Sequence, residues 1–286
     1  MPFFSVIIPV YNGAGTIKAC LESVKAQSFS DYEVVVINDG STDDTVNLIE
    51  DFQSAHPKLP LRVITQENQG LGASRNTGIS MASGIFCALL DADDLWKPEK
   101  LKSIYKVLEG SGTPLLYHRV ETFGRAKTRV RACRPVHTVR NLLIGGNPLV
   151  PSAVCLRTDM AQKHPFSTEP GVHGAEDLLL WCRLLHQKIT FRYLPEVLTS
   201  YRDEGGMSTR LEEHLQKVHN VLKQLRHKEI ISESTLKQAL QRKEYEAARF
   251  YHKRGHYTLA TKHYAASPKN PKVWLLRLLN DLSLPA

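Results

Sequence analysis

The stretch LLDADDLW, residues 89–96, is the part of the chain around which the rest is organised. An apolar run expected to form a strand over residues 86–90 leads directly into three carboxylates within four residues. Burying carboxylates side by side is costly unless a cation or hydrogen-bond donors meet them. A strand end followed by a helix cap with solvated acids explains the triplet equally well, because Asp-x-Asp is common by chance. The meaning of this stretch therefore depends on what lies beside it.

Four apolar runs in the first 110 residues are each followed by a polar turn and a helix-like pattern. Because strands that alternate with helices form a parallel sheet, we expect a largely parallel sheet covered by helices. The strand ends would bring Asn12, Asp39, Asn68 and Asp91 to one edge, where open α/β sheets bind ligands. The four expected strands cover residues 4–10, 32–37, 61–64 and 86–90.

The turn after the first strand looks only superficially like a dinucleotide-binding loop. Gly13 and Gly15 match the first two glycines of Gly-x-Gly-x-x-Gly, but Lys18 stands at the third position. The third glycine is needed for close helix–strand packing. We therefore predict no nicotinamide or flavin site here.

The second strand is followed by Ser41 and Asp44, whose spacing predicts a capping box for the next helix. This structural role accounts for Asp44. It leaves Asp39 unexplained, although Asp39 follows the strand at the edge where ligands bind.

The pattern changes after residue 110. Strands are expected over residues 115–120 and 153–156, and Glu176 and Asp177 open a helix. Acids in a first helical turn are commonplace, because the helix dipole favours them. Residues 208–286 are mostly helical by pattern. Within them, residues 245–274 resemble one tetratricopeptide-type unit, which cannot bury its own face and is expected to form a packed helical hairpin.

Charge is unevenly distributed along the chain. Residues 1–110 hold 9 Lys and Arg against 14 Asp and Glu, whereas residues 111–286 hold 28 against 15. The net charge of +8 therefore lies in the second half, which suits an anionic partner: phospholipid headgroups, a lipid diphosphate or nucleic acid. A solvated basic surface is the plain alternative.

Composition points to an ordinary globular protein. Hydrophobic content is 42% and charged content is 23%. No apolar run of about 18 residues and no secretory signal pattern is present, so neither a membrane span nor export is expected. The five cysteines are scattered and are expected to be buried thiols in a reducing compartment, with the cytoplasm as the default.

Five motifs together resemble family 2 glycosyltransferases with the GT-A fold, over roughly residues 3–204. Any one of them is weak, but their order along the chain matches the order in the family. The motifs are residues 6–12 (VIIPVYN), residues 38–45 (NDGSTDDT), residues 68–76 (NQGLGASRN), residues 90–94 (LDADD) and residues 176–184 (EDLLLWCRL).

The resemblance implies a fold and a division of the chain. The fold is a Rossmann-like α/β GT-A architecture, with a mixed, mainly parallel sheet flanked by helices and a C-terminal helical extension. We predict a glycosyltransferase domain over residues 1–207, of which residues 1–110 bind the nucleotide and residues 111–207 bind the acceptor. The helical extension would cover residues 208–286.

The resemblance also implies a donor site and a divalent cation. A nucleotide-diphosphate leaving group develops charge, which Mn²⁺ or Mg²⁺ stabilises through carboxylate ligands. By similarity, Asp93 is the metal ligand and Asp91 holds the ribose or the waters of the metal, whereas Asp94 receives no role. Asp39 would accept from the ring N–H of the base, which favours uracil or thymine. Pro9, Tyr11 and Asn12 would line the base and ribose pocket, and Asn68 and Arg75 would also bind the nucleotide, with Arg75 near its diphosphate. For Arg75, an ordinary ion pair with a nearby Asp is the plain alternative.

Transfer also needs a base, because the acceptor hydroxyl has a very high pKa. In the family that the chain resembles, the Asp of the Glu-Asp pair removes this proton in one in-line displacement that inverts the anomeric centre. We therefore assign Asp177 as the base and Glu176 as its orienter or as an acceptor contact. A hydrolase would instead place an acid and a base across the scissile bond.

One position departs from the family pattern, in which a His often follows a Tyr-Arg pair. Here Glu204 stands at that position, followed by Gly205 and Gly206. The departure leaves open how the far side of the metal is completed, and the two glycines suggest a segment able to close over the donor. The acceptor is expected to meet loops that carry His118, Asn147, Ser152 and His173.

The predicted function is a metal-dependent inverting hexosyl- or N-acetylhexosaminyltransferase. It would move a sugar from a nucleotide-diphospho-sugar, with UDP favoured, to a glycan or lipid-linked acceptor in cell-surface polysaccharide synthesis. The expected partners exclude nucleic acid and leave open a peripheral contact with an anionic membrane at its inner face. Alternatives are a nucleotidyltransferase of related fold and a degenerate binding module that uses the helical tail.

Overall fold

The computed structural model describes residues 1–124, 128–202 and 211–283. Its first part repeats strand and helix as predicted. In chain order these elements are β1 (Phe4–Val10), α1 (Ile17–Lys25), β2 (Tyr32–Asn38), α2 (Thr45–Ala55), β3 (Leu61–Thr65), α3 (Leu71–Ser80), β4 (Phe86–Leu89), β5 (Leu95–Trp96) and α4 (Lys100–Leu108).

The second part of the chain, up to residue 202, is less regular. It contributes the two longest strands together with short helices. Its elements are β6 (Leu115–Phe123), β7 (Arg129–Val130), α5 (Val139–Gly145), the 3₁₀ turn η1 (Pro151–Ala153), β8 (Val154–Arg157), α6 (Thr158–Lys163), the 3₁₀ turn η2 (Pro170–Val172), α7 (Glu176–His186) and β9 (Phe191–Arg202).

The strands form one mixed sheet in the order β3-β2-β1-β4-β8-β6-β9-β5, with β7 paired to β6. The strands β3, β2, β1 and β4 are mutually parallel, as predicted from their alternation with helices. Strand β8 runs antiparallel to both of its neighbours, whereas β6 and β9 are parallel. The sheet therefore has a regular parallel half joined to a mixed half, and the joint lies between β4 and β8.

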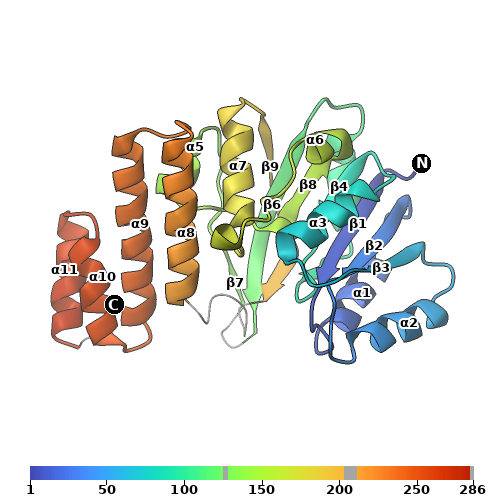
Figure 1. The fold of residues 1–286 in the computed structure, drawn as a ribbon, viewed down its shortest axis with the longest axis horizontal. Helices are drawn as coiled ribbons and strands as arrows, with labels where there is room; N and C mark the ends of the chain where they lie inside the picture. The colour runs from blue at the N-terminus through green and yellow to red at the C-terminus, as the bar shows by residue number, and fades with distance from the viewer. Residues whose placement is uncertain (125–127, 203–210, 284–286) are drawn as a thin grey trace.

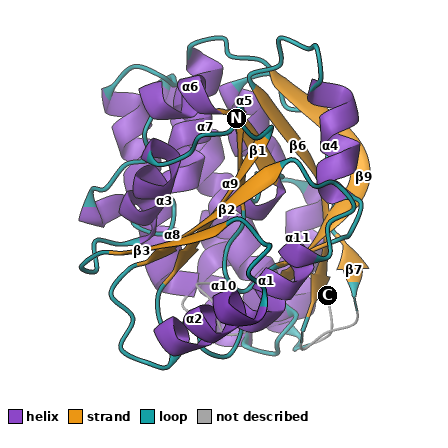
Figure 2. Ribbon diagram, turned by 90° about the vertical axis from the view of Figure 1, so that its right-hand side faces the viewer, coloured by secondary structure: helices purple, strands orange, loops and turns teal. Residues whose placement is uncertain are grey.

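Alternating side chains of the central strands build a core on each face of the sheet. Ile7 packs on the face that α3, α5, α6 and α7 cover, whereas Val6 and Ile8 pack on the face that α1, α2 and α4 cover. Figure 2 shows α1 and α2 on one side of β1–β3 and α3 on the other. Because successive residues of a strand point to opposite faces, these apolar runs require helices on both sides.

Strand β9 brings the far end of the chain back to the carboxylate stretch. Its pairing with β6 shifts register on either side of Arg119, where Pro195 lies in β9 and has no N–H to donate. Beyond this irregularity, Thr199 and Ser200 pair with the short strand β5. As a result, β9 ends at Arg202, directly beside the Asp93–Asp94 pair.

The capping box predicted for Ser41 and Asp44 is wrong. Helix α2 begins at Thr45, and Asp44 caps it without a side-chain hydrogen bond. The Ser41 hydroxyl instead accepts from the backbone N–H of Asn12 at 3.0 Å. The loop after β2 is therefore used to hold the loop after β1.

The tail forms four helices, α8 (Leu211–His227), α9 (Glu233–His252), α10 (Tyr257–Ala266) and α11 (Pro271–Asp281). They extend in a row from the sheet, with α10 and α11 at the end farthest from β1–β3 (Figure 1). Helix α8 shares the core beneath α7 through Val218 and Leu222, whereas α10 and α11 pack in a separate cluster with the end of α9. The domain boundary at residue 207 remains a prediction, and α8 packs like part of the main core.

No helix in the described ranges is long and apolar enough to cross a membrane. The longest, α9, has 20 residues but carries charged side chains along its whole length.

Candidate active site

A pocket of about 620 Å³ opens at the edge of the sheet where the parallel strands end. It gathers the residues predicted at those strand ends, from loops that are far apart in sequence. Those of the predicted nucleotide- and metal-binding residues that line it are Pro9, Tyr11, Asn12, Asp39, Asn68, Asp91 and Asp93. Residues that line it without having been assigned to the nucleotide or metal include Gly70, Ser74, His173, Tyr201 and Arg202.

Asp39 is buried, and it organises the loop that follows β3. One carboxylate oxygen, Oδ1, accepts from the backbone N–H of Gln69 at 3.0 Å and from the side chain of Gln66 at 2.8 Å. The other, Oδ2, accepts from the N–H of Gly70 at 2.8 Å. A carboxylate has about four lone-pair sites, so one remains, on Oδ2, for a ligand N–H.

Asn12 fixes the floor of the pocket from the end of β1. Its backbone is in the left-handed region, with φ of 49°, which Asn tolerates better than most residues. Its side-chain oxygen accepts from the backbone N–H of Thr42 at 2.8 Å. The two loops that would hold the base and ribose are thereby joined to each other.

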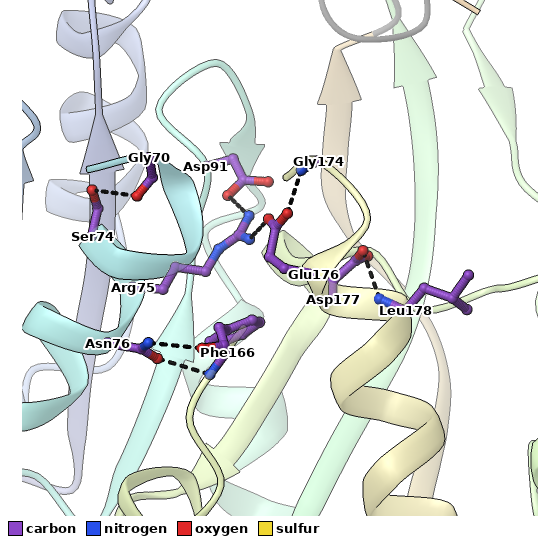
Figure 3. A network of polar contacts seen from close by, with 10 residues as sticks. All are labelled: Gly70, Ser74, Arg75, Asn76, Asp91, Phe166, Gly174, Glu176, Asp177 and Leu178. Carbon is purple, nitrogen blue, oxygen red and sulfur yellow. Dashed lines mark hydrogen bonds and ion pairs between the residues drawn. The ribbon is translucent and has the colours of Figure 1, made fainter. Parts of the chain in front are cut away.

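Arg75, in α3, connects the two halves of the molecule. Its guanidinium donates to Asp91 at 2.6 Å and to Glu176 at 2.7 Å, and it lies 5.3 Å from the centre of the Phe166 ring. The side chain of Arg75 is only 2% exposed, and so is that of Glu176. Figure 3 shows Arg75 reaching between the two carboxylates. Because both of its terminal nitrogens are already paired, the predicted diphosphate contact of Arg75 would have to compete with these ion pairs.

The carboxylates after β4 form a centre of negative charge. Burial, together with the neighbouring Asp91, raises the pKa of Asp93 above its usual range. Burial and the negative charges of Asp91 and Asp93 raise the pKa of Asp94 further. Asp94 accepts from the backbone N–H of Arg202 at 2.8 Å. Raised carboxyl pKa values mean that the ionised cluster is destabilised until a cation neutralises it.

The donor set fits a hard divalent cation bound together with a diphosphate. In the described ranges, His, Cys, Asp and Glu side chains nowhere gather in threes as a complete metal cage. Mg²⁺ is usually held by one or two carboxylates plus substrate phosphates rather than by an all-protein cage. Asp91 and Asp93 on the pocket wall meet that description.

Ser152, in η1, supports the carboxylate loop from beneath. Its hydroxyl accepts from the backbone N–H of Asp91 at 3.0 Å. Its carbonyl accepts from Trp96 Nε1, from Lys100 Nζ and from the hydroxyl of Thr199. Ser152 is fully buried. Its hydrogen bonds connect the loop after β4 with α4 and β9, next to the predicted metal ligands.

Glu176 and Asp177 begin α7 and differ in environment. Glu176 is buried, pairs with Arg75 and accepts from the backbone N–H of Gly174. Asp177 is half-buried, and among the described residues its carboxylate accepts one hydrogen bond, from the backbone N–H of Leu178 at 2.7 Å, as Figure 3 shows. Burial, and next the charge of Glu176, raises the pKa of Asp177 to about 7. A carboxylate with that pKa suits a general base near neutral pH.

Several expectations for the second half need revision. His118 and Ser152 do not face an acceptor, because both are fully buried, His118 within β6. Asn147 is partly buried and caps its own turn by accepting from Leu149. Glu204, Gly205 and Gly206 lie outside the described residues.

Arg202 was missed by sequence reasoning and His173 was predicted only as an acceptor contact, although both line the pocket. Arg202 donates to the backbone carbonyl of Asp93 at 2.9 Å and stacks on Phe123. The Tyr201-Arg202 pair stands directly before Glu204 and was the available signal. His173 packs against Gly70, where an added Cβ would lie 2.9 Å from its ring, and the left-handed φ of 89° also favours glycine there.

The architecture and its pocket define a GT-A-like α/β protein, and solved structures similar to it share this fold. Staphylococcus aureus TarS 1–349 in complex with UDP-GlcNAc has a TM-score of 0.65 and 21% identity, covering 98% of this chain and 86% of that one. A mannosyltransferase from Pyrobaculum calidifontis, in complex with GDP-Man and Mn²⁺, has a TM-score of 0.65 and 19% identity, covering 99% and 80%.

Sequence comparison gives the family. The profile described as Glycosyl transferase family 2 matches residues 5–149, and the chain belongs to this family. The match covers the whole parallel half of the sheet and the first part of the mixed half.

Individual relatives match over stretches of 123 to 219 residues. An uncharacterized glycosyltransferase of Nostoc sp. is 41% identical over 125 residues, which is 43% of this chain and 38% of that protein. The glycosyltransferase AglE of Haloferax volcanii is 41% identical over 123 residues, 42% of this chain and 40% of that protein. The chain thus covers less than two thirds of these relatives. The putative teichuronic acid biosynthesis glycosyltransferase TuaG of Bacillus subtilis is 26% identical over 219 residues, 70% of this chain and 79% of that protein.

Proposed function

We propose that the protein is a metal-dependent inverting glycosyltransferase that moves a sugar from a UDP-sugar to a hydroxyl of a glycan or lipid-linked acceptor. The observation that carries the proposal is the buried guanidinium of Arg75, paired at once with Asp91 and with Glu176. It joins a carboxylate of the nucleotide pocket to the start of α7, where Asp177 has a pKa suited to a base. A protein that only binds a nucleotide would need the pocket carboxylates, but it would not need a base at the start of α7.

Asp93 and Asp91 are the residues that would hold Mn²⁺ or Mg²⁺ together with the donor diphosphate. When bound, such an ion stabilises the charge that develops on the leaving nucleoside diphosphate. Arg202 fixes the backbone of Asp93 from the side of β9, because its guanidinium donates to the carbonyl of Asp93.

Asp177 would take the proton of the acceptor hydroxyl as its oxygen attacks the anomeric carbon. The carbon–oxygen bond to the diphosphate breaks in the same displacement, and the electron pair leaves with the nucleoside diphosphate. Attack from the face opposite the leaving group inverts the anomeric centre. Because the diphosphate is already a good leaving group, one carboxylate base is sufficient and no general acid is needed.

The donor nucleotide is proposed from Asp39 and from the relatives. The remaining lone pair of Asp39 suits the ring N–H of uracil, and TarS was solved with UDP-GlcNAc. The mannosyltransferase of P. calidifontis was solved with GDP-Man, so a guanine donor is the main competitor. The name of TuaG and the basic second half of the chain support an anionic or lipid-linked acceptor in cell-surface polysaccharide synthesis.

The test is a thermal unfolding screen against UDP, GDP and their sugars, each with and without Mn²⁺, followed by a measurement of donor turnover. A ligand that binds only the native state raises the unfolding temperature. We expect the largest rise with UDP or a UDP-sugar plus Mn²⁺, and slow release of UDP on incubation. Release of pyrophosphate from a nucleoside triphosphate would instead indicate a nucleotidyltransferase, and binding without turnover of any acceptor–donor pair would indicate a binding module.

A further inference from the structure

The outer face of α11, at the far end of the tail, is apolar and is not covered by any of the described residues. Trp274, Leu275 and Leu278 are exposed by 67%, 50% and 41%, and Leu282 just after the helix is exposed by 60%. At 3.6 residues per turn these four side chains fall within an arc of about 100°. We call these four residues the apolar stripe.

The opposite side of α11 accounts for its packing. Val273 and Leu276 are buried against α10 and the end of α9, and Asn280 donates to the carbonyl of Tyr257 at 3.0 Å. Because α11 is already anchored by this side, the apolar stripe is not needed to hold the helix in place. Figure 1 shows α11 at the outer end of the row of tail helices.

Positive charge surrounds the apolar stripe. Residues 251–286 contain six Lys and Arg but a single acid, Asp281. Lys269 and Arg277 line the same hollow as Trp274, and Lys272 is exposed one turn before Leu275. Asp281 lies 4.0 Å from Arg277, so the one negative charge is partly neutralised. A Trp and leucines flanked by basic side chains are the features of helices that lie in a membrane interface.

We propose that the apolar stripe docks the protein on an anionic lipid surface, with α11 lying in the plane of the interface. Charge decides between this occupant and a second copy of the chain. Two copies that met through α11 would bring two strongly basic segments together, whereas an anionic leaflet attracts them. The proposal is independent of the proposed activity, because the stripe lies on the tail and not at the donor pocket.

Tryptophan fluorescence gives a direct test on the whole chain. Of the three tryptophans, Trp96 and Trp181 are buried and only Trp274 is exposed. We expect vesicles of phosphatidylcholine with phosphatidylglycerol to shift the emission to the blue and to protect it from iodide. Trp274→Phe should abolish the signal while sedimentation with the vesicles persists. An unchanged emission in the presence of bound vesicles would place the contact elsewhere.

Two pairs of variants separate the apolar and the charged contributions. Trp274→Ser with Leu278→Ser should weaken vesicle binding more than about tenfold, since two large apolar side chains are lost from the interface. Leu259→Ser, at an equally exposed leucine on α10 outside the stripe, is the matched control. Lys269→Gln and Lys272→Gln should each weaken binding about fivefold at low salt, whereas Lys58→Gln in the catalytic half should not.

Three outcomes would overturn the proposal. They are equal binding to neutral and anionic vesicles, no binding to either, and a concentration-dependent dimer that Trp274→Ser with Leu278→Ser dissociates. In every variant the rise in unfolding temperature with UDP and Mn²⁺ should stay as in the unmodified protein, which keeps this test separate from that of the donor site.

Discussion

The two halves of the sheet reach the same pocket in different ways. In residues 1–110 the pocket is lined from the loops and helix starts that follow β1, β2, β3 and β4, and these four strands are parallel. In residues 111–202 the lining residues are His173, just after η2, and Tyr201 and Arg202 at the end of the long strand β9, whereas η1 and the start of α7 contact Asp91 and Arg75 through Ser152 and Glu176. The first half therefore supplies most of the pocket from successive strand ends, whereas the second supplies its part from segments that lie far apart in the sequence.

The site lies at the boundary between the two halves of the sheet. Arg75 of the first half donates to Glu176 of the second half. The hydroxyl of Ser152, in the second half, accepts from the backbone N–H of Asp91 in the first half. Each half thus holds in place the charged residues of the other. The following changes act on one half or on the link between the two, from the largest expected effect to the smallest.

Asp177→Asn acts on the second half alone. General base catalysis contributes about 10²–10⁴-fold, so transfer should fall by that factor while the affinity for donor is retained. Turnover with a UDP-sugar and calorimetric titration with UDP plus Mn²⁺ measure the two quantities. Asp159→Asn, at another acid in a first helical turn, is the matched control, and full activity of Asp177→Asn would move the base elsewhere.

The pH dependence of Asp177 gives a second readout. With a pKa of about 7 the carboxylate ionises as pH rises through neutrality, so the rate should rise with pH over that range. Stability should change in the opposite sense. The folded state keeps a proton that the unfolded carboxyl loses near pH 4, so this group favours folding at low pH and its contribution falls between about pH 4 and 7. Asp177→Asn should remove both effects.

Arg75→Met breaks the link between the halves. It leaves Asp91 and the buried Glu176 without their cation, and removing one partner of a buried ion pair costs about 3–5 kcal/mol. Chemical denaturation measures the loss. Arg62→Met is the matched control, because its pair with Glu33 is 2.8 Å long but Arg62 is 45% exposed, and it should cost less than about 1 kcal/mol. Equal losses in the two variants would mean that Arg75 does not join the halves.

Asp93→Asn acts on the first half. Even outer-shell partners of a metal cost about 10–100-fold in metal affinity, so loss of a direct ligand should weaken Mn²⁺-dependent nucleotide binding at least about tenfold. Binding without metal should change little. Asp51→Asn, on the exposed side of α2, is the control, and an unchanged metal dependence would clear Asp93 of this role.

Ser152→Ala has the smallest expected effect. The N–H of Asp91 loses its acceptor, while the carbonyl of residue 152 keeps its three donors. We expect a loss of about 1 kcal/mol in stability and a modest fall in donor affinity, measured by denaturation and titration. Ser80→Ala, at an exposed serine of α3, should be neutral by both measures. A donor affinity that stays unchanged in Ser152→Ala would show that the loop needs no support from η1.

The difference between the halves also explains how much of the fold and of the candidate site could be predicted from the sequence. Asp39 and Asp91 were found because a strand end and the residue after it are neighbours in sequence. Strand β9 was missed, although it delivers Tyr201 and Arg202, because Pro195 and the register shift interrupt its alternation. Ser152 and His118 were misplaced because nothing local distinguishes a buried polar residue from one on an exposed loop.

The contacts of Arg75 could also be predicted only in part from the sequence. The sequence suggested either a diphosphate contact or an ion pair with a nearby Asp. Its second partner, Glu176, lies 101 residues away, and only the assembled fold brings them together.

The most direct test of the central claim is the configuration of the sugar first released when the donor is hydrolysed by water. UDP-glucose and UDP-GlcNAc, both α-linked, would be incubated with the protein and Mn²⁺, and the new anomer followed by proton NMR before mutarotation. If Asp177 activates the attacking water on the face opposite the diphosphate, the sugar released is the β-anomer. Asp177→Asn should then abolish this release. Release of the α-anomer, or an equal rate in Asp177→Asn, would contradict the account.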